Sequence, residues 1–323
     1  MARDGVLILT PRDRAAWLAA RKRDVTASTI GALFGVHDFL SPLELWALKT
    51  GRIRESDEEN EAMRRGRLLE PVAVQILKET RPEWLIHHNA AENVYYRDPV
   101  ARIGATPDVL ADCPRRGLGV VQIKSVEAGV YRRKWLVDGP EEPPEVPFWI
   151  VLQAMLEAYL VGAKWAAVAP LVIGFTVDIP VIDIPLDHME GVAGAMKEKV
   201  AGFWQMVAED REPPVDYAQD AALVDRLFAV GDAREEVDLT ADNRIPELLD
   251  TIRGMALIAK EAEAKKRAAE AEIKSKMGAA EVAHIAGGRT ITWKTHRKPQ
   301  TTIAASTYRA LRLPTPDTRK ERP

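Results

Sequence analysis

The segment ATPDVLADCPRRGLGVVQIKSV, residues 105–126, decides the fold that we expect for this chain. Apolar and β-branched residues dominate it in two runs that turn signals separate, a pattern typical of paired strands. It predicts strands at 103–111 and 119–126. In the flanking sequence, apolar residues recur with the period of helices. The chain is therefore expected to have an α/β core.

Three polar residues of this segment indicate one kind of chemistry. Asp108 lies inside the first predicted strand, and Gln122 and Lys124 are two residues apart on the second, so they project from one face. If the strands pair, a carboxylate, an amide and an ammonium converge. Such a group can hold a divalent cation through oxygen ligands beside a positive charge, which suits phosphodiester hydrolysis. The plainer alternative is that Asp108 ends a turn and that Lys124 is a charge at a strand edge.

A second candidate carboxylate is Glu70, on a helix predicted at 61–78. Gly66 lies four residues earlier on the same helix face, where a glycine permits close approach of the backbone. Pro71 follows Glu70 directly, although a proline inside a helix costs ~3 kcal/mol. A local rule broken beside a carboxylate indicates a functional position. The alternative is a surface glutamate on a kinked helix.

A third group lies near the N-terminus and consists of Trp17, Arg21, Thr26 and Ser28. A helix, a turn and a second helix are predicted over 12–33, with the second helix opening near Thr26. Amides and hydroxyls at a helix N-terminus bind phosphate, and an arginine adds a charge-assisted hydrogen bond. An ordinary helix cap beside a solvated basic helix explains the same residues.

The composition excludes several classes of protein. The 323 residues are 29% charged and 46% hydrophobic with a net charge of −3, so we expect a globular chain that is not generally basic. The single cysteine, Cys113, excludes an internal disulfide and a four-cysteine metal site, and a reducing cytosol fits best. No apolar run approaches the ~18 residues of a membrane span, and no signal peptide is expected. The six histidines lack metal-ligand spacing and are interpreted as structural or surface residues, and the following tryptophans are interpreted as core: Trp135, Trp149, Trp165 and Trp204.

Three regions are predicted along the chain: a core over 1–215, an acidic connector over 216–245 and an appendage over 246–323. The appendage begins with a long helix rich in Ala, Glu and Lys, predicted at 245–283, which carries a narrow apolar seam. A strand predicted at 289–295 and a basic tail follow.

Four motifs in order resemble the PD-(D/E)xK nuclease superfamily and, more closely, the YqaJ-like viral recombinase (phage lambda exonuclease) family. The resemblance covers about residues 12–210. It rests on the following motifs: W-x3-R-x4-T-A-S from Trp17 to Ser28, G-x3-E from Gly66 to Glu70, A-T-P-D from Ala105 to Asp108, and Q-I-K from Gln122 to Lys124. It implies a restriction-endonuclease-like core, in which helices flank a mixed central sheet, followed here by the long helix and a short β appendage.

The resemblance also implies roles for single residues. Asp108 resembles the central metal ligand, which position 122 and the backbone carbonyl of Ile123 complete. Lys124 resembles the catalytic lysine, and Glu70 the helix carboxylate near a second metal. The DNA-binding residues implied are Arg21, Thr26 and Ser28, of which Arg21 and Ser28 engage a 5′-phosphate, and Gln153 as a residue that lines the site.

One position departs from the family pattern, because the family usually carries glutamate where this chain has Gln122. The amide still offers a carbonyl oxygen, but one negative charge is lost, so we expect weaker metal binding and retained activity. Glu127 lies three residues past Lys124, and the parity of an ideal strand places it on the other face.

The implied activity is that of a Mg²⁺-dependent exonuclease, with Mn²⁺ as an alternative cation. It removes one strand of double-stranded DNA from its 5′ end and leaves 3′ single-stranded overhangs for recombination. Two alternatives stay open: a structure-specific or restriction-type endonuclease on the same core, and a DNA-end-binding protein that has lost catalysis through Gln122. The implied setting is the cytoplasm of a bacterial host, for a phage or prophage gene, with a single-strand annealing protein as partner and no membrane. A homo-oligomeric ring is left open.

Overall fold

The computed structural model describes residues 2–54, 61–137, 139, 141–231, 235–297 and 309–314. The chain divides into two compact units, Met1–Leu227 and Phe228–Pro323, which are described separately. All candidate site residues lie in the first unit. The boundaries predicted at 215 and 245 stay a prediction.

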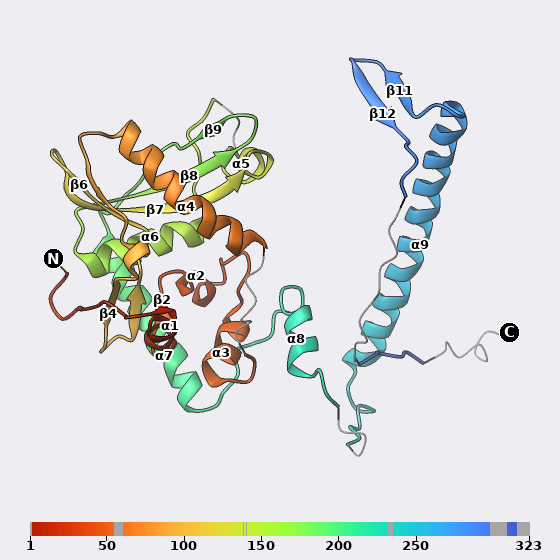
Figure 1. Cartoon of the computed structure of the whole chain (residues 1–323). Helices are drawn as coiled ribbons and strands as arrows, with labels where there is room; N and C mark the ends of the chain where they lie inside the picture. The colour runs from red at the N-terminus through yellow and green to blue at the C-terminus, as the bar shows by residue number, and fades with distance from the viewer. Residues whose placement is uncertain are drawn as a thin grey trace. The chain divides into compact units, whose positions relative to one another are not determined.

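A mixed sheet forms the centre of the first unit (Figure 1). Its strands follow the order β10-β8-β7-β6-β3, and β9 also pairs with β8. The long inner strands β7 and β8 run parallel, and the other pairs are antiparallel. The bounds are β3 Leu85–His87, β6 Val109–Cys113, β7 Gly117–Glu127, β8 Trp165–Ile173, β9 Val177–Asp178 and β10 Ile182–Ile184.

A smaller sheet of order β1-β4-β5-β2 belongs to the same unit. Its strands are β1 Leu7–Leu9, β2 Val25–Thr26, β4 Tyr95–Asp98 and β5 Ile103–Ala105, and a 3₁₀ turn, η1, spans Ala90–Glu92. The short strand β2 runs parallel to β5. This pairing places the segment after β2 beside the segment after β5.

Helices cover both faces of the large sheet. The helices of this unit are α1 Arg14–Lys22, α2 Ile30–Leu33, α3 Pro42–Thr50, α4 Glu61–Thr80, α5 Ala128–Lys134, α6 Phe148–Val161, α7 Met189–Ala208 and α8 Ala221–Leu227. On one face, α4 packs Ala73, Val74 and Leu77 against strand residues such as Val121 and Ile123. On the other face, α6 packs beside Val120 and Val168. The expected class, an α/β core with a mixed sheet between helices, is confirmed.

Helix α6 lies in the centre of the main core. Its eleven buried residues are apolar except for Gln153 and Glu157, which is the pattern of a helix covered on all sides. The two polar residues are one turn apart and therefore share a helix face.

Two predictions near the site are wrong in detail. The strand predicted at 103–111 is two strands, β5 and β6, and Asp108 lies in the bend between them. Pro107 favours the break because it lacks a backbone N–H and cannot donate a hydrogen bond to a neighbouring strand. The second N-terminal helix begins at Ile30 rather than near Thr26, because Val25 and Thr26 pair with β5. Ser28 therefore lies in the connecting turn.

The second unit contains α9 Arg244–Met277 and a hairpin of β11 Val282–Ile285 with β12 Arg289–Thr292. The helix ends at Met277, six residues before the predicted end. Gly278 follows in the positive-φ region, and a strand begins at Val282. Three residues, Ala286 to Gly288, join the two strands, and Gly287 and Gly288 both have positive φ, which glycine adopts without steric cost. These two glycines therefore belong to the hairpin turn.

None of the helices in the described part of the chain is long and apolar enough to cross a membrane.

Candidate active site

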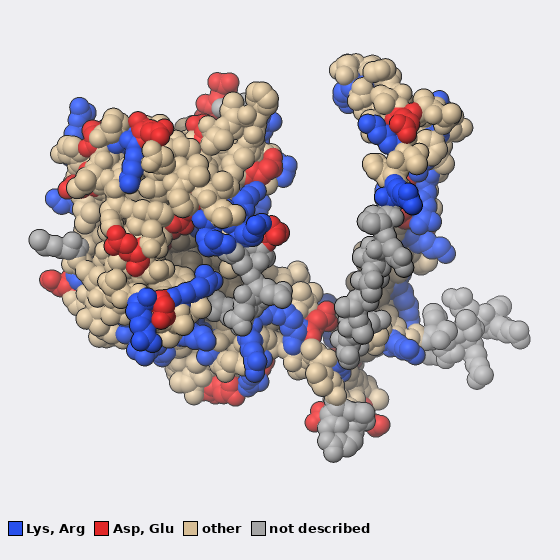
Figure 2. Space-filling view, in the orientation of Figure 1, with Lys and Arg blue, Asp and Glu red and all other residues tan. Residues whose placement is uncertain are grey.

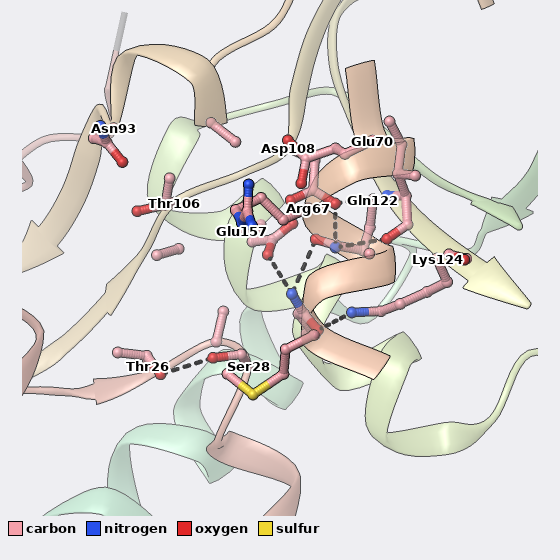
Figure 3. Close-up of a pocket in the computed structure, with 18 of the residues that line it drawn as sticks. Thr26, Ser28, Arg67, Glu70, Asn93, Thr106, Asp108, Gln122, Lys124 and Glu157 are labelled. Atoms are coloured by element: carbon pink, nitrogen blue, oxygen red, sulfur yellow. Dashed lines mark hydrogen bonds between the residues drawn. The ribbon is translucent and has the colours of Figure 1, made fainter. Parts of the chain in front are cut away.

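A pocket of about 1190 Å³ opens between α1, α4, α6 and the strand ends of both sheets. It is lined by all nine residues that the sequence singled out: Arg21, Thr26, Ser28, Glu70, Asp108, Gln122, Ile123, Lys124 and Gln153. Figure 3 shows side chains from these separate elements pointing into one space. Sequence positions more than 100 residues apart therefore meet at one place.

Strand register brings Asp108 to the centre of the pocket. Val109, the first residue of β6, pairs with Val121 of β7, so the preceding bend lies opposite Gln122 and Ile123. Asp108 Oδ2 accepts hydrogen bonds from the Ile123 backbone N–H, at 2.8 Å, and from the Gln122 amide. Burial and then the nearby charge of Glu70 raise the pKa of Asp108 to about 7. The carboxyl is therefore poised between its neutral and charged forms near neutral pH.

A chain of side-chain hydrogen bonds connects Asp108 to α6. The Gln122 Nε2 group donates to Asp108 Oδ2 and to the Ile123 carbonyl, and Gln122 Oε1 accepts from Gln153 Nε2 at 3.0 Å. Gln153 Oε1 in turn accepts from Lys124 Nζ at 2.9 Å. Lys124 and Gln122 project from the same strand face, as the spacing predicted. In this arrangement the nitrogen of the Gln122 amide, and not its oxygen, faces Asp108.

Lys124 is held from two sides. Besides Gln153, its Nζ lies 5.1 Å from the centroid of the Trp149 ring, in cation–π range. Burial lowers the pKa of Lys124, and the charge of Asp108 opposes this shift. Trp149 is half-buried, packs against the main core and also lines the pocket, whereas Trp135, Trp165 and Trp204 are buried.

Sequence reasoning did not single out Glu157. This residue is 1% exposed, and its Oε1 accepts a hydrogen bond from Gln153 Nε2 at 2.9 Å. Its Oε2 is buried without a hydrogen-bond partner among the described residues. Burial and then the charge of Asp108 raise the pKa of Glu157 well above its ordinary value. A glutamate one turn after Gln153 in an otherwise apolar helix was the available signal, because such a position rarely carries a charge.

Glu70 also faces the pocket, where it pairs with a histidine. The 2.7 Å contact joins Glu70 Oε1 to Nε2 of His88, which follows β3 directly. The interpretation of every histidine as structural or surface missed this contact, because strand β3 and helix α4 meet only in the folded chain. A side chain at Gly66 would meet no described protein atom within 4 Å, so packing does not require this glycine.

The third motif forms a small polar cluster at another wall of the pocket. The Arg21 guanidinium donates to Ser28 Oγ at 3.2 Å and stacks over the Trp17 ring, with 4.3 Å from Cζ to the centroid. Ser28 Oγ and Thr26 Oγ1 are 3.0 Å apart. Trp17 Nε1 donates to Thr106 Oγ1 at 2.9 Å, so α1 is tied to the bend that carries Asp108.

A buried ion pair anchors this cluster. Asp24, which is fully buried, accepts hydrogen bonds from Arg97 and from the Tyr95 hydroxyl. Lys49 donates to the Asp24 backbone carbonyl at 2.7 Å. These contacts fix the start of β2, and with it the turn that presents Thr26 and Ser28.

Basic side chains border the pocket. Figure 2 shows Lys and Arg side chains on both sides of a hollow in the first unit, over α1 and the N-terminal part of α4. The basic residues of these two stretches are Arg14, Arg21, Lys22, Arg64, Arg65 and Arg67. An anionic ligand is attracted to such an opening.

The residues present fit a divalent cation. Asp108 Oδ2 and the Ile123 carbonyl already converge on one partly positive group, the Gln122 amide N–H₂. Buried Glu157 Oε2 has no hydrogen-bond partner among the described residues, and Glu157 lines the same pocket. No cluster of three or more His, Cys, Asp or Glu side chains suited to a metal occurs in the part of the chain that the structure describes. A cation here would therefore rely on mixed carboxylate and carbonyl oxygens, the ligands that Mg²⁺ accepts.

Glu127 does not belong to this group. It is exposed and caps α5, where its carboxylate accepts hydrogen bonds from the N–H groups of Gly129 and Val130. It does not line the pocket, so Glu127 does not replace the charge that the family pattern has at position 122.

Comparison with known proteins agrees with the motifs. Residues 16–162 match the family model of the YqaJ-like viral recombinase domain. The resemblance that the four motifs indicated is therefore confirmed over these residues, as is the expected nuclease class. No curated protein matches the chain.

Solved structures give more distant likenesses. An alkaline exonuclease (LHK-Exo) from Laribacter hongkongensis is 19% identical, with a TM-score of 0.45 over 65% of this chain and 98% of that chain. The same exonuclease in complex with dAMP is 18% identical, with a TM-score of 0.42 over the same shares of both chains. A protein from Eubacterium rectale is 12% identical, with a TM-score of 0.43 over 73% of this chain and 98% of that chain. At these identities and scores the likeness does not extend to the roles of single residues.

Proposed function

We propose that this chain is a Mg²⁺-dependent exonuclease that degrades one strand of double-stranded DNA from its 5′ end. The observation that carries the proposal is that two functional groups open into one pocket. One is the polar cluster of Arg21 and Ser28, which suits a phosphate, and the other is the acid and lysine pair of Asp108 and Lys124. A nuclease that binds a terminal phosphate beside its cleavage residues acts at ends.

The polar cluster receives the terminal 5′-phosphate. Arg21 offers a guanidinium, which matches phosphate geometry, and the hydroxyls of Thr26 and Ser28 add donors. The next phosphodiester along the strand then lies toward Asp108. A water oxygen forms a bond to its phosphorus, and the bond to the 3′-oxygen of the terminal nucleotide breaks. The attacking water loses a proton, and the leaving 3′-oxygen takes one up.

Each turnover releases a 5′-mononucleotide and leaves a new 5′-phosphate on the shortened strand. The product therefore restores the group that the polar cluster recognises. The undegraded strand becomes a 3′ single-stranded overhang, which is a substrate for strand annealing. A single-strand annealing protein is the partner that we propose for this product.

The cleavage residues have separate tasks. Asp108 and the Ile123 carbonyl would hold the cation, which, when bound, offsets charge on the phosphate and acidifies water. Lys124, fixed by Gln153 and Trp149, places a positive charge where negative charge develops on the phosphoryl group. Glu70, oriented by His88, offers a carboxylate for a second cation.

Digestion of doubly end-labelled linear duplex with Mg²⁺ tests the proposal. Substrates with and without a 5′-phosphate are compared, beside covalently closed circular duplex. We expect mononucleotides from 5′ ends, faster release when the 5′-phosphate is present, and intact circles. Lys124→Ala should lower the release rate ~100-fold or more at an unchanged melting temperature, because charge stabilisation in the transition state is lost. Arg21→Ala should reduce the preference for the 5′-phosphate.

Three results would contradict the proposal. Cleavage of closed circles would identify an endonuclease. Binding to duplex ends without nucleotide release in Mg²⁺ or Mn²⁺ would identify an end-binding protein, in which Gln122 has removed catalysis. An unchanged rate in Lys124→Ala would show that the cleavage residues lie elsewhere.

A further inference from the structure

Glu157 occupies a position that packing alone does not explain. It lies on α6 among eleven buried residues, one turn after Gln153, and is 1% exposed. One carboxylate oxygen accepts a single hydrogen bond, from the neutral amide of Gln153, and the other has no hydrogen-bond partner among the described residues. A buried carboxyl group with an unsatisfied oxygen is costly unless a proton or a cation reaches it. Glu157 lines the same pocket as Asp108, and Figure 3 shows both side chains there.

The hydrogen-bond chain fixes which way the Gln122 amide points. Gln153 Oε1 accepts a hydrogen bond from Lys124 Nζ, and Gln153 Nε2 donates one to Glu157 Oε1. A lysine ammonium only donates, so Gln153 cannot turn its amide over without opposing its N–H₂ group to Lys124. Its nitrogen therefore also faces Gln122 Oε1.

This orientation occupies the oxygen of Gln122. Because Gln122 Oε1 accepts from Gln153, its N–H₂ group is directed at Asp108 and the Ile123 carbonyl. An N–H donor cannot be a cation ligand. The oxygen that would complete the pocket, together with the negative charge absent at position 122, has to come from another side chain. Glu127 is exposed, caps α5 and does not line the pocket, so it does not supply this oxygen.

We propose that Glu157 supplies the second carboxylate of the cation site, in place of the strand residue at position 122. Its unpaired Oε2 joins Asp108 and the Ile123 carbonyl as an oxygen donor, and Gln153 positions it through Oε1. The negative charge that the family pattern has at position 122 on β7 is thus supplied from α6, within the same pocket. This inference rests on the proposed function, because the cation is the one that the nuclease would use.

Mn²⁺ binding to the full-length protein without DNA tests the proposal, by titration followed by electron paramagnetic resonance. Glu157→Gln keeps the shape of the side chain and removes its charge. We expect it to weaken Mn²⁺ binding by ~10-fold or more. The exchange variant Gln122→Glu/Glu157→Gln returns the charge to the strand and should restore affinity to within ~3-fold of the wild type.

The chain offers a matched control on another helix. Gln75 and Glu79 of α4 have the same spacing and the same 2.9 Å hydrogen bond as Gln153 and Glu157, but they are exposed. Glu79→Gln should leave Mn²⁺ affinity unchanged. Melting temperatures of all variants, measured without metal, show that each one folds.

The outcomes separate this inference from the proposed function. Mn²⁺ affinity in Glu157→Gln that stays within ~3-fold of the wild type would overturn the inference, as would an exchange variant that does not recover affinity or a wild type that binds no Mn²⁺. Glu157-dependent Mn²⁺ binding without nucleotide release from DNA would support the inference and contradict the proposed function. Equal Mn²⁺ affinity and equal nucleotide release in wild type and Glu157→Gln would overturn the inference and support the proposed function.

Discussion

Asp108 makes cation binding depend on pH at the scale of a single residue. Its pKa is raised to about 7 by burial and by Glu70, so below pH 7 the carboxyl is mostly neutral and above pH 7 it is mostly charged. A cation needs the charged form. We expect apparent Mn²⁺ affinity to rise ~10-fold per pH unit below about pH 7 and to level off above it. Titrations from pH 6 to 9 measure this, and a pH-independent affinity would contradict it.

The same raised pKa predicts how stability depends on pH without metal. The folded protein binds the Asp108 proton more tightly than the unfolded chain does. Its stabilising contribution is complete below the unfolded pKa of about 4 and is lost as pH rises to about 7. Asp108→Asn removes this loss. Its melting temperature should therefore exceed that of the wild type by ~2 °C or more at pH 8 and approach it at pH 4.

His88 is a positioning residue for Glu70. Its Nε2 lies 2.7 Å from Glu70 Oε1, and both side chains are mostly covered. His88→Ala should lower kcat with little change in the KM for DNA, because DNA contacts elsewhere in the pocket remain. His88→Gln, which keeps a hydrogen-bond donor, should recover part of kcat. A loss seen in KM alone, or no recovery in His88→Gln, would show that His88 does not act through Glu70.

At the scale of elements, close packing of β4 on β5 holds the phosphate cluster in place. A Cβ atom added at Gly104 would lie 2.0 Å from the Tyr95 hydroxyl, which donates to buried Asp24. Gly104→Ala should therefore destabilise the protein by ~1–3 kcal/mol, measured by urea unfolding. In the matched control Gly202→Ala, on the exposed side of α7, the added Cβ meets nothing within 4 Å. That variant should gain ~0.5–1 kcal/mol from helix propensity. Equal effects of the two substitutions would contradict this role of Gly104.

The elements that the sequence predicted well are long and regular. Helix α4 and strand β7 lie close to their predicted ranges, because each repeats its apolar pattern over several turns or alternations. The short elements failed where tertiary pairing decides. Val25 and Thr26 become a strand only because β5 lies beside them, and the end of α9 depends on the hairpin that follows.

The same distinction applies to the site. Motif residues that share one strand or follow a sharp break, such as Gln122, Lys124 and Asp108, carry a local signal. His88 does not, because its partner Glu70 comes from another element and only folding brings the two together. Glu157 carried only the weak signal of a glutamate in an otherwise apolar helix. Trp149 packs against the core as predicted, but the sequence does not show that its ring also lies beside Lys124.

At the scale of the whole molecule, the first unit contains every residue that lines the pocket. The second unit contributes a helix with several exposed apolar side chains, such as Leu248, Ile252 and Met255, and a hairpin. A chain that ends after residue 231 should therefore fold and keep its Mn²⁺ affinity within ~2-fold of the full chain. Loss of Mn²⁺ binding in a folded truncated chain, judged by circular dichroism, would show that the second unit takes part in the site.

The crossing from β5 to β6 has one more consequence. Thr106, held by Trp17, belongs with the wall that carries Arg21, and Asp108 belongs with the wall that carries Lys124. Only Pro107, the most rigid residue available, separates them along the chain. Under the proposed function, the three consecutive residues Thr106, Pro107 and Asp108 therefore fix the distance from the terminal phosphate to the scissile bond. Because covalent bonds keep this distance constant, we expect every cleavage to release a product of the same length.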